Sequence, residues 1–132
     1  MEVNYFSLLR LRRHFGPLLR QRPASSRRTW VNVLSIAALC SLPSRQTFAA
    51  SMAAAWSFSQ GDRAQSRAFG LRVVNVLPGP MAADPLARAI VVGLEGGVED
   101  LYPGELAQEW LTRWLESPKA LEREIAEREV AR

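Results

Sequence analysis

The sequence has 132 residues, 48% of them hydrophobic and 23% charged, which predicts one domain with a modest core. Its net charge of +4 combines +9 over residues 1–79 with −5 over residues 80–132. Sixteen of the seventeen basic residues are Arg, and they are not accompanied by aromatic residues or by a known nucleic-acid-binding motif, so we expect no nucleic-acid partner. No apolar run approaches the roughly 18–20 residues needed to cross a bilayer, and arginines interrupt the N-terminus where a secretory signal is apolar, so we expect no membrane partner and a cytoplasmic location.

The first half of the chain predicts a helix, a strand and a second helix. Residues 2–21 have the periodicity of an amphipathic helix, with arginines on another face, and Gly16-Pro17 should bend or break it. Residues 29–35 (TWVNVLS) form a short run with little alternation, which predicts a strand buried on both faces. Residues 47–68 are alanine-rich and end before Gly70, which favours a helix. The apolar positions of the first helix are Val3, Phe6, Leu9, Phe15, Leu18 and Leu19.

The second half continues the alternation. Residues 71–80 (LRVVNVLPGP) predict a buried strand that Pro-Gly-Pro stops, and residues 84–97 predict a helix with Asp84 as its N-cap. A brief strand at 99–103 and a terminal helix over 105–132 follow. Alternating helices and strands predict an α/β fold with about three parallel strands.

Four segments resemble, in order, the C-terminal half of the short-chain dehydrogenases/reductases. EVNYFSLLRL (2–11) resembles the start of the family's asparagine helix, and WVNVLSIAAL (30–39) resembles the strand that carries its catalytic serine. GLRVVNVLPGP (70–80) resembles the strand and turn under the nicotinamide, and LEGGVEDLYPGELAQEW (94–110) resembles the last short strand and the next helix. The resemblance covers nearly the whole chain and implies a partial Rossmann-like fold, about the latter half of a doubly wound parallel sheet.

The resemblance also fixes a register in the segment RQTFAASMAAAW (45–56). In the family the catalytic tyrosine follows the serine by thirteen residues, and a lysine follows the tyrosine by four. Counting from Ser35 places Phe48 in the tyrosine position and Met52 in the lysine position. We interpret the pair as an eroded Tyr-x-x-x-Lys motif; the alternative is an ordinary helix in which side chains one turn apart pack together.

The family implies a role for each matched position. Its tyrosine transfers a proton to or from the substrate oxygen, and its lysine lowers the phenol pKa and holds the nicotinamide ribose. Ser35 would hydrogen-bond the substrate carbonyl, and Asn4 would hold a water next to the lysine. Pro78, Gly79 and Pro80 would be a vestigial nicotinamide-side turn. The alternatives are a strand-end serine, a helix-capping asparagine and a plain turn.

The glycine-rich phosphate loop of the family has no match in this sequence. Gly96-Gly97 closes a predicted helix instead of opening one, so nothing fits a pyrophosphate cradle. We therefore expect residues 1–132 to form a single truncated domain without the N-terminal cofactor-phosphate-binding half. NAD or NADP is implied by the resemblance, but we expect this chain alone not to bind it.

No other catalytic chemistry is indicated. Cys40 is the only cysteine, so we expect no intrachain disulfide, and His14 is the only histidine, so we expect no metal site and no serine-hydrolase triad. The simplest interpretations are a small buried hydrophobe for Cys40 and a surface residue for His14.

Three hypotheses about function remain. The chain is a catalytically inactive, truncated oxidoreductase-like remnant (a pseudoenzyme); or a non-enzymatic module that pairs with itself or a full-length relative; or one piece of a longer reading frame. For pairing, the resemblance implies packing through residues 2–21 and 47–68. An open sheet edge further predicts marginal stability or oligomerisation. The plausible anchors of such an interface are Leu8, Leu11, Phe15, Trp56 and Phe58.

Overall fold

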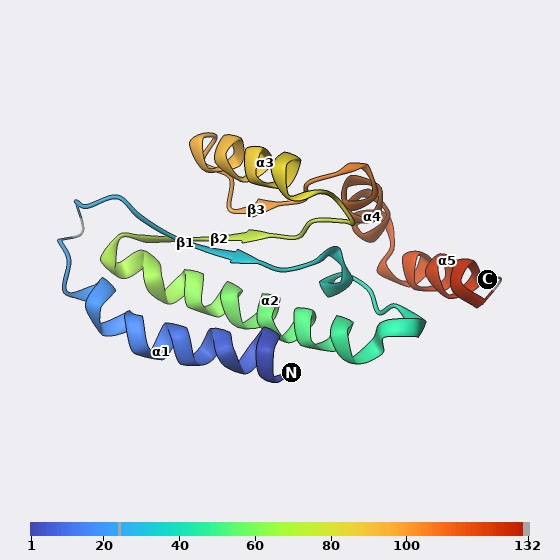
Figure 1. The fold of residues 1–132 in the computed structure, drawn as a ribbon, viewed down its shortest axis with the longest axis horizontal. Coiled ribbons are helices and arrows are strands. Elements are labelled where there is room, and N and C mark those ends of the chain that lie inside the picture. Colours follow the sequence, from blue (N-terminus) through green and yellow to red (C-terminus); the bar gives the residue numbers. More distant parts are fainter. Residues whose placement is uncertain (24, 131–132) are drawn as a thin grey trace.

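The protein is a three-stranded parallel sheet with helices on both faces (Figure 1). The structure, a computed structural model, describes residues 1–23 and 25–130. Strands β1 (Arg28–Val33), β2 (Leu71–Val76) and β3 (Asp100–Leu101) lie in the order β1-β2-β3, and both pairings are parallel. The predicted α/β class and parallel sheet are therefore confirmed.

The helices form two layers. Helices α1 (Ser7–Arg20) and α2 (Gln46–Ser66) run side by side along one face of the sheet, and α3 (Ala83–Glu95) lies on the other (Figure 1). Helices α4 (Glu105–Glu116) and α5 (Pro118–Val130) lie beyond the carboxyl ends of the strands. Short turns complete the chain: a π-type turn over Glu2–Phe6 and 3-10 turns over Ile36–Ala38, Pro43–Arg45 and Arg67–Phe69.

Helix α1 does not bury the face that its apolar periodicity predicts. Its buried residues are Leu8, Arg12 and Gly16, whereas Phe15 and Leu18 are exposed. Arg12 points inward because it forms an ion pair with Asp62 of α2: Nε donates to Oδ2 over 2.6 Å. Arg12 therefore shares the buried face of α1 with Leu8, and does not lie on a face separate from the apolar residues as the sequence predicts.

The predicted break at Gly16-Pro17 does not occur. Helix α1 continues through Pro17 to Arg20. Because Pro17 lies in the last turn, the only acceptor that loses its intrahelical partner is the carbonyl of Arg13. Arg13 is exposed, so water can satisfy that carbonyl.

The two longer strands differ in burial. Five of the six residues of β2 are buried, as predicted for a strand covered on both faces. In β1 only Asn32 is buried, and Thr29 and Val33 are exposed. The expectation of burial on both faces is wrong for β1 because it is an edge strand, paired on one side only among the described residues.

Two predicted boundaries also move. The terminal helix is two helices, because Ser117 is extended (φ −163°, ψ 106°) and its Oγ accepts from the amide of Ala120. Helix α3 begins at Ala83, so Asp84 lies in its first turn and is not its N-cap. Residues 131–132 of the predicted last helix, and Ala24 of the connector, lie outside the described residues.

The hydrophobic core lies between α2, the carboxyl end of β2, and helices α4 and α5. This core supports the pocket described below. Its buried members include Ile36, Leu39, Met52, Leu77, Trp110, Leu121 and Ile125.

Within residues 1–23 and 25–130, no helix combines the length and apolarity needed to cross a membrane.

A row of polar side chains crosses the sheet at one level. Asn32 of β1 and Asn75 of β2 are register partners, and Asn32 Nδ2 donates to Asn75 Oδ1 over 3.1 Å. Asn75 Nδ2 in turn donates to Asp100 of β3 over 2.9 Å, and Ser59 of α2 donates to Asn75 Oδ1 over 2.7 Å. All polar atoms of the Asn75 side chain are therefore satisfied, which allows this residue to be completely buried.

Candidate functional site

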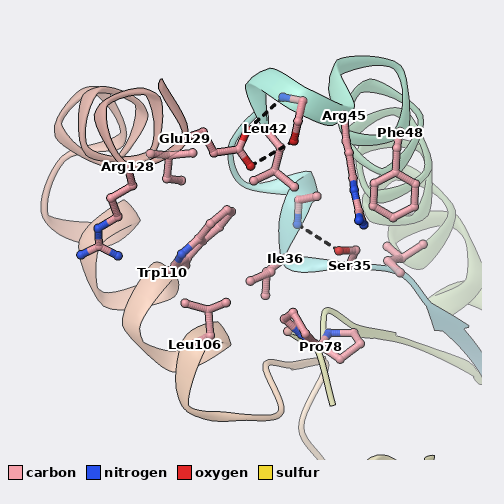
Figure 2. A pocket seen from close by; sticks show the side chains of 16 residues that line it. Ser35, Ile36, Leu42, Arg45, Phe48, Pro78, Leu106, Trp110, Arg128 and Glu129 are labelled. Atoms are coloured by element: carbon pink, nitrogen blue, oxygen red, sulfur yellow. Dashed lines mark hydrogen bonds between the residues drawn. The ribbon is translucent and has the colours of Figure 1, made fainter. Parts of the chain in front are cut away.

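A pocket of about 670 Å³ opens at the carboxyl ends of β1 and β2 (Figure 2). Its walls come from the segment after β1, the start of α2, the turn after β2, and helices α4 and α5. In an open parallel sheet this is the end at which ligands bind, because loops rather than covering helices surround it. Ser35, Phe48, Pro78, Gly79 and Pro80 of the predicted site all line this pocket.

Backbone hydrogen bonds to the extension of β2 fix the position of Ser35. The amide of Leu34 donates to Val76 over 2.7 Å, and that of Ile36 donates to Pro78 over 3.1 Å. Ser35 Oγ accepts from the amide of Ala37 over 3.2 Å and so caps the 3-10 turn. Its hydroxyl proton is left free to be donated to a ligand.

Phe48 and Met52 lie one turn apart on α2 but face different spaces. Phe48 is half-buried and forms part of the pocket wall (Figure 2). Met52 is only 8% exposed, belongs to the core, and lines a second, smaller cavity of about 240 Å³. Leu34 separates the two spaces, since it lines both. Of the three positions counted in the sequence, Ser35 and Phe48 therefore line one pocket, and Met52 lines the second cavity.

Asn4 lies at the second cavity together with Met52. Its Nδ2 donates to Ser51 Oγ over 2.9 Å, and Ser51 Oγ donates to the carbonyl of Phe48 over 2.7 Å. The side chain of Asn4 therefore binds α2 and does not cap its own helix. It lies close in space to positions 48–52, as the resemblance predicts.

The turn Pro78-Gly79-Pro80 is packed beneath the start of α4. The amide of Gly79 donates to Pro103 over 3.3 Å, and a Cβ added to Gly79 would lie 3.4 Å from Ala107 N and Leu106 Cβ. The start of α4 therefore lies against one side of this turn, and the pocket lies along Gly79 and Pro80.

The sequence-based site missed the charged residues of the pocket. Arg128 donates to Glu109 from both Nη atoms over 3.2 Å, and Glu129 accepts from the amide and hydroxyl of Ser44 over 2.9 and 3.1 Å. Arg45 reaches from the start of α2 into the pocket toward Ser35 (Figure 2). Its position three residues before Phe48, hence on the same helix face, is the only sequence signal that could have identified it.

No group of three or more His, Cys, Asp or Glu side chains that could hold a metal ion occurs in the part of the chain that the structure describes. The sole cysteine, Cys40, is half-buried.

Solved structures of short-chain dehydrogenases share this fold. A short-chain dehydrogenase from Burkholderia cenocepacia, solved in complex with NADP, is 35% identical, with a TM-score of 0.85 over 95% of this chain. A short-chain dehydrogenase from Streptomyces avermitilis is 24% identical (TM-score 0.78 over 98% of this chain), and a bulky-bulky ketone specific alcohol dehydrogenase from Comamonas testosteroni is 21% identical (TM-score 0.68 over 89%). No family model and no curated protein matches the chain.

The chain therefore has the fold of part of a short-chain dehydrogenase. It covers 56%, 60% and 49% of these three proteins, respectively, so it spans about half of their length. The similarity is to oxidoreductases with a Rossmann-like sheet, and the partial parallel sheet is common to them all.

The described residues do not fit a nicotinamide cofactor. Met52 is uncharged, buried in the core and a weak acceptor only, so it cannot donate a hydrogen bond to a ribose hydroxyl. The described helices also contain no glycine-rich turn that opens a helix after a strand.

Proposed function

We propose that this chain is an oxidoreductase-like protein that has kept the pocket and lost the proton-transfer chemistry. The observation that carries the proposal is that the ring of Phe48 lines the same pocket as the hydroxyl of Ser35. A tyrosine in this position would present a phenol to a carbonyl oxygen held by Ser35. Phenylalanine presents only carbon.

The residues present define what the pocket lacks. Phe48 has no proton to transfer, and Met52 has no charge with which to lower the pKa of a neighbouring acid. Loss of a general acid–base group costs about 10²–10⁴-fold in rate. Met52 is buried and has no hydrogen-bond donor for the ribose of a nicotinamide cofactor, so the proposal includes no bound NAD or NADP.

The test is carbonyl reduction by the purified chain with NADH and NADPH, using a panel of aliphatic and aromatic ketones. We expect no turnover above that of buffer, because Phe48, at the position of the family's tyrosine, has no proton to transfer and Met52 has no charge. The double variant Phe48→Tyr/Met52→Lys is expected to remain inactive, since the described residues form no phosphate cradle. Far-UV circular dichroism establishes that it folds, and Phe48→Tyr alone serves as the variant without a buried lysine. Ketone-dependent oxidation of NADPH by the wild-type chain or by the double variant would overturn the proposal.

A second candidate function is pairing with another copy or with a full-length relative through α1 and α2. Its support is a stripe on α1, at helical spacing, of Leu11 (48% exposed), Phe15 (41%) and Leu18 (55%). Of the other predicted anchors, Leu8 is buried within the chain. Trp56 packs against Trp114, and Phe58 against Tyr5, with ring centroids 5.9 and 6.5 Å apart. The interface would therefore depend on the α1 stripe.

Light scattering coupled to size exclusion tests this second candidate. We expect a dimer that dissociates when Leu11, Phe15 and Leu18 are all replaced by Gln, because the stripe is then polar. The matched control replaces two exposed valines of α3, Val91 and Val92, by Gln and should leave the dimer intact. A wild-type chain that remains monomeric at high micromolar concentration would eliminate pairing with itself.

A further inference from the structure

The hydrogen-bonding groups of the pocket are unevenly satisfied. Both carboxylate oxygens of Glu129 accept hydrogen bonds from Ser44, and the guanidinium of Arg128 is bound to Glu109. Among the described residues no hydrogen bond or ion pair engages the side chain of Arg45, whose amide donates to the carbonyl of Leu42. Its guanidinium is therefore a basic group of the pocket without a carboxylate partner, at the α2 side, and the Glu129 carboxylate, held by the neutral donors of Ser44, remains the acidic group of the wall.

Ser35 adds a second free donor close to that charge. Its Oγ already accepts from the amide of Ala37, so what it has left to offer a ligand is its O–H. Figure 2 shows the Arg45 side chain extending toward Ser35, next to the ring of Phe48. Two donors that lie on one side of a pocket favour a ligand group that presents acceptor oxygens to both.

Apart from Ser44, Arg128 and Glu129, most of the remaining wall is apolar. Ile36, Phe48, Leu106, Trp110 and Ile125 line the pocket, and Trp110 lies across from Arg45 (Figure 2). A volume of about 670 Å³ falls within the range of small-molecule sites. A ligand that fills it must have an apolar body in addition to its acceptor group.

We propose that this pocket binds a monocarboxylate with an aliphatic or aromatic body, and that Arg45 and Ser35 bind the carboxylate. The two oxygens of a carboxylate match the planar fork of a guanidinium, and the negative charge of the ligand would pair with the Arg45 guanidinium, which has no carboxylate partner among the described residues. The inference deepens the proposed function and rests on it in one respect, since it takes the pocket to be a binding site without redox chemistry.

Calorimetric titration of the full chain tests the inference, with no nicotinamide cofactor present. The probes are 3-phenylpropanoate, octanoate and the neutral 3-phenylpropanamide. We expect at least one acid to bind, and the amide to bind about tenfold more weakly than 3-phenylpropanoate if the aromatic acid is the ligand. Binding of octanoate alone would support the same site with an aliphatic body. Affinity should fall as salt is raised, because the contact is between charges near the surface.

Three substitutions test whether the carboxylate of the ligand binds to Arg45. Arg45→Gln should weaken binding of the acid about tenfold, whereas Arg45→Lys, which keeps the charge, should weaken it less. Arg88→Gln makes the same charge change on the exposed face of α3, away from the pocket, and should leave the affinity unchanged.

The inference is overturned if neither acid binds at millimolar concentration, if the amide binds as well as its acid, or if Arg45→Gln and Arg88→Gln behave alike. These outcomes are separate from a failure of the proposed function. Ketone reduction by the wild-type chain would contradict the lack of redox chemistry and leave the titrations as they are. Absence of acid binding leaves the turnover prediction untouched.

Discussion

Removing the carboxylate of Asp62 should strongly destabilise the protein. Arg12 and Asp62 are only 7% and 11% exposed, and Arg12 also donates to Ser66 over 3.1 Å. The guanidinium lies 5.0 Å from the ring of Trp30, and its Nη1 already lacks a hydrogen-bond partner within the described residues. Asp62→Ala leaves this cation buried and unpaired.

The magnitude follows from what is left behind. Breaking a buried ion pair by removing one partner costs about 3–5 kcal/mol, a large share of the roughly 5–15 kcal/mol that stabilises a typical domain. Replacing both partners by apolar residues, as in Arg12→Met/Asp62→Leu, removes the unpaired charge and should restore most of this loss. The exposed pair between Arg10 and Glu2 provides the control: Glu2→Ala should cost less than about 1 kcal/mol.

Urea denaturation followed by circular dichroism, at one protein concentration for all variants, measures these differences. We expect Asp62→Ala to be far less stable than the wild type. The double replacement and Glu2→Ala should both be close to the wild type in stability. If Asp62→Ala costs no more than Glu2→Ala, the ion pair is not the reason why α1 turns Arg12 inward, and the account of that helix fails.

Two further predictions concern single side chains. Gly93→Ala should cost about 1–3 kcal/mol, because the added Cβ would clash with the side chain of Leu101 on β3. Gly61→Ala, with open space around it, should gain about 0.5–1 kcal/mol, so thermal melts of the two variants should move in opposite directions. Burial raises the pKa of the Cys40 thiol, and the charge of Glu122 raises this pKa further, so iodoacetamide should modify the folded chain at pH 8.5 more slowly than the urea-unfolded chain. Equal alkylation rates of the folded and the unfolded chain would contradict this prediction. Because the pKa of Cys40 is higher in the folded chain, the contribution of the thiol to stability is complete at pH values below its pKa in the unfolded chain, and it is lost as the pH rises through its pKa in the folded chain.

The elements that could be predicted from the sequence are those whose local pattern agrees with their final packing. The continuous apolar run of β2 indicates a central strand, and the structure buries it. The three-layer order and the parallel sheet follow from the alternation of helices and strands. The placement of Ser35 and Phe48 in one pocket was reached through the resemblance, by counting positions.

The features that could not be predicted depend on partners distant in the sequence. Arg12 is buried because it forms an ion pair with Asp62, which lies fifty residues further along the chain. The same ion pair turns α1 so that Leu11 and Phe15 are exposed. β1 has nearly the composition of a central strand but lies at an edge, a property of topology and not of its residues. A local signal was available for the boundary between the last two helices, since Ser117-Pro118 has the form of an N-cap followed by proline.

The buried polar row was also signalled. Both long strands contain Val-Asn-Val, at 31–33 and 74–76, and the register pairs the two asparagines. A polar residue at the same place in two otherwise apolar strands indicates a satisfied pair, because a lone buried amide is costly.

Direct titration of the wild-type chain with NADPH, followed by the fluorescence of the reduced nicotinamide, tests the central claim most directly. The account predicts no saturable change up to millimolar cofactor, because Met52 offers no donor to the ribose and the described residues form no glycine-rich phosphate cradle. An intact short-chain dehydrogenase, titrated in parallel, shows that the assay detects binding. Saturable enhancement of NADPH fluorescence at micromolar concentrations by the wild-type chain would contradict the account.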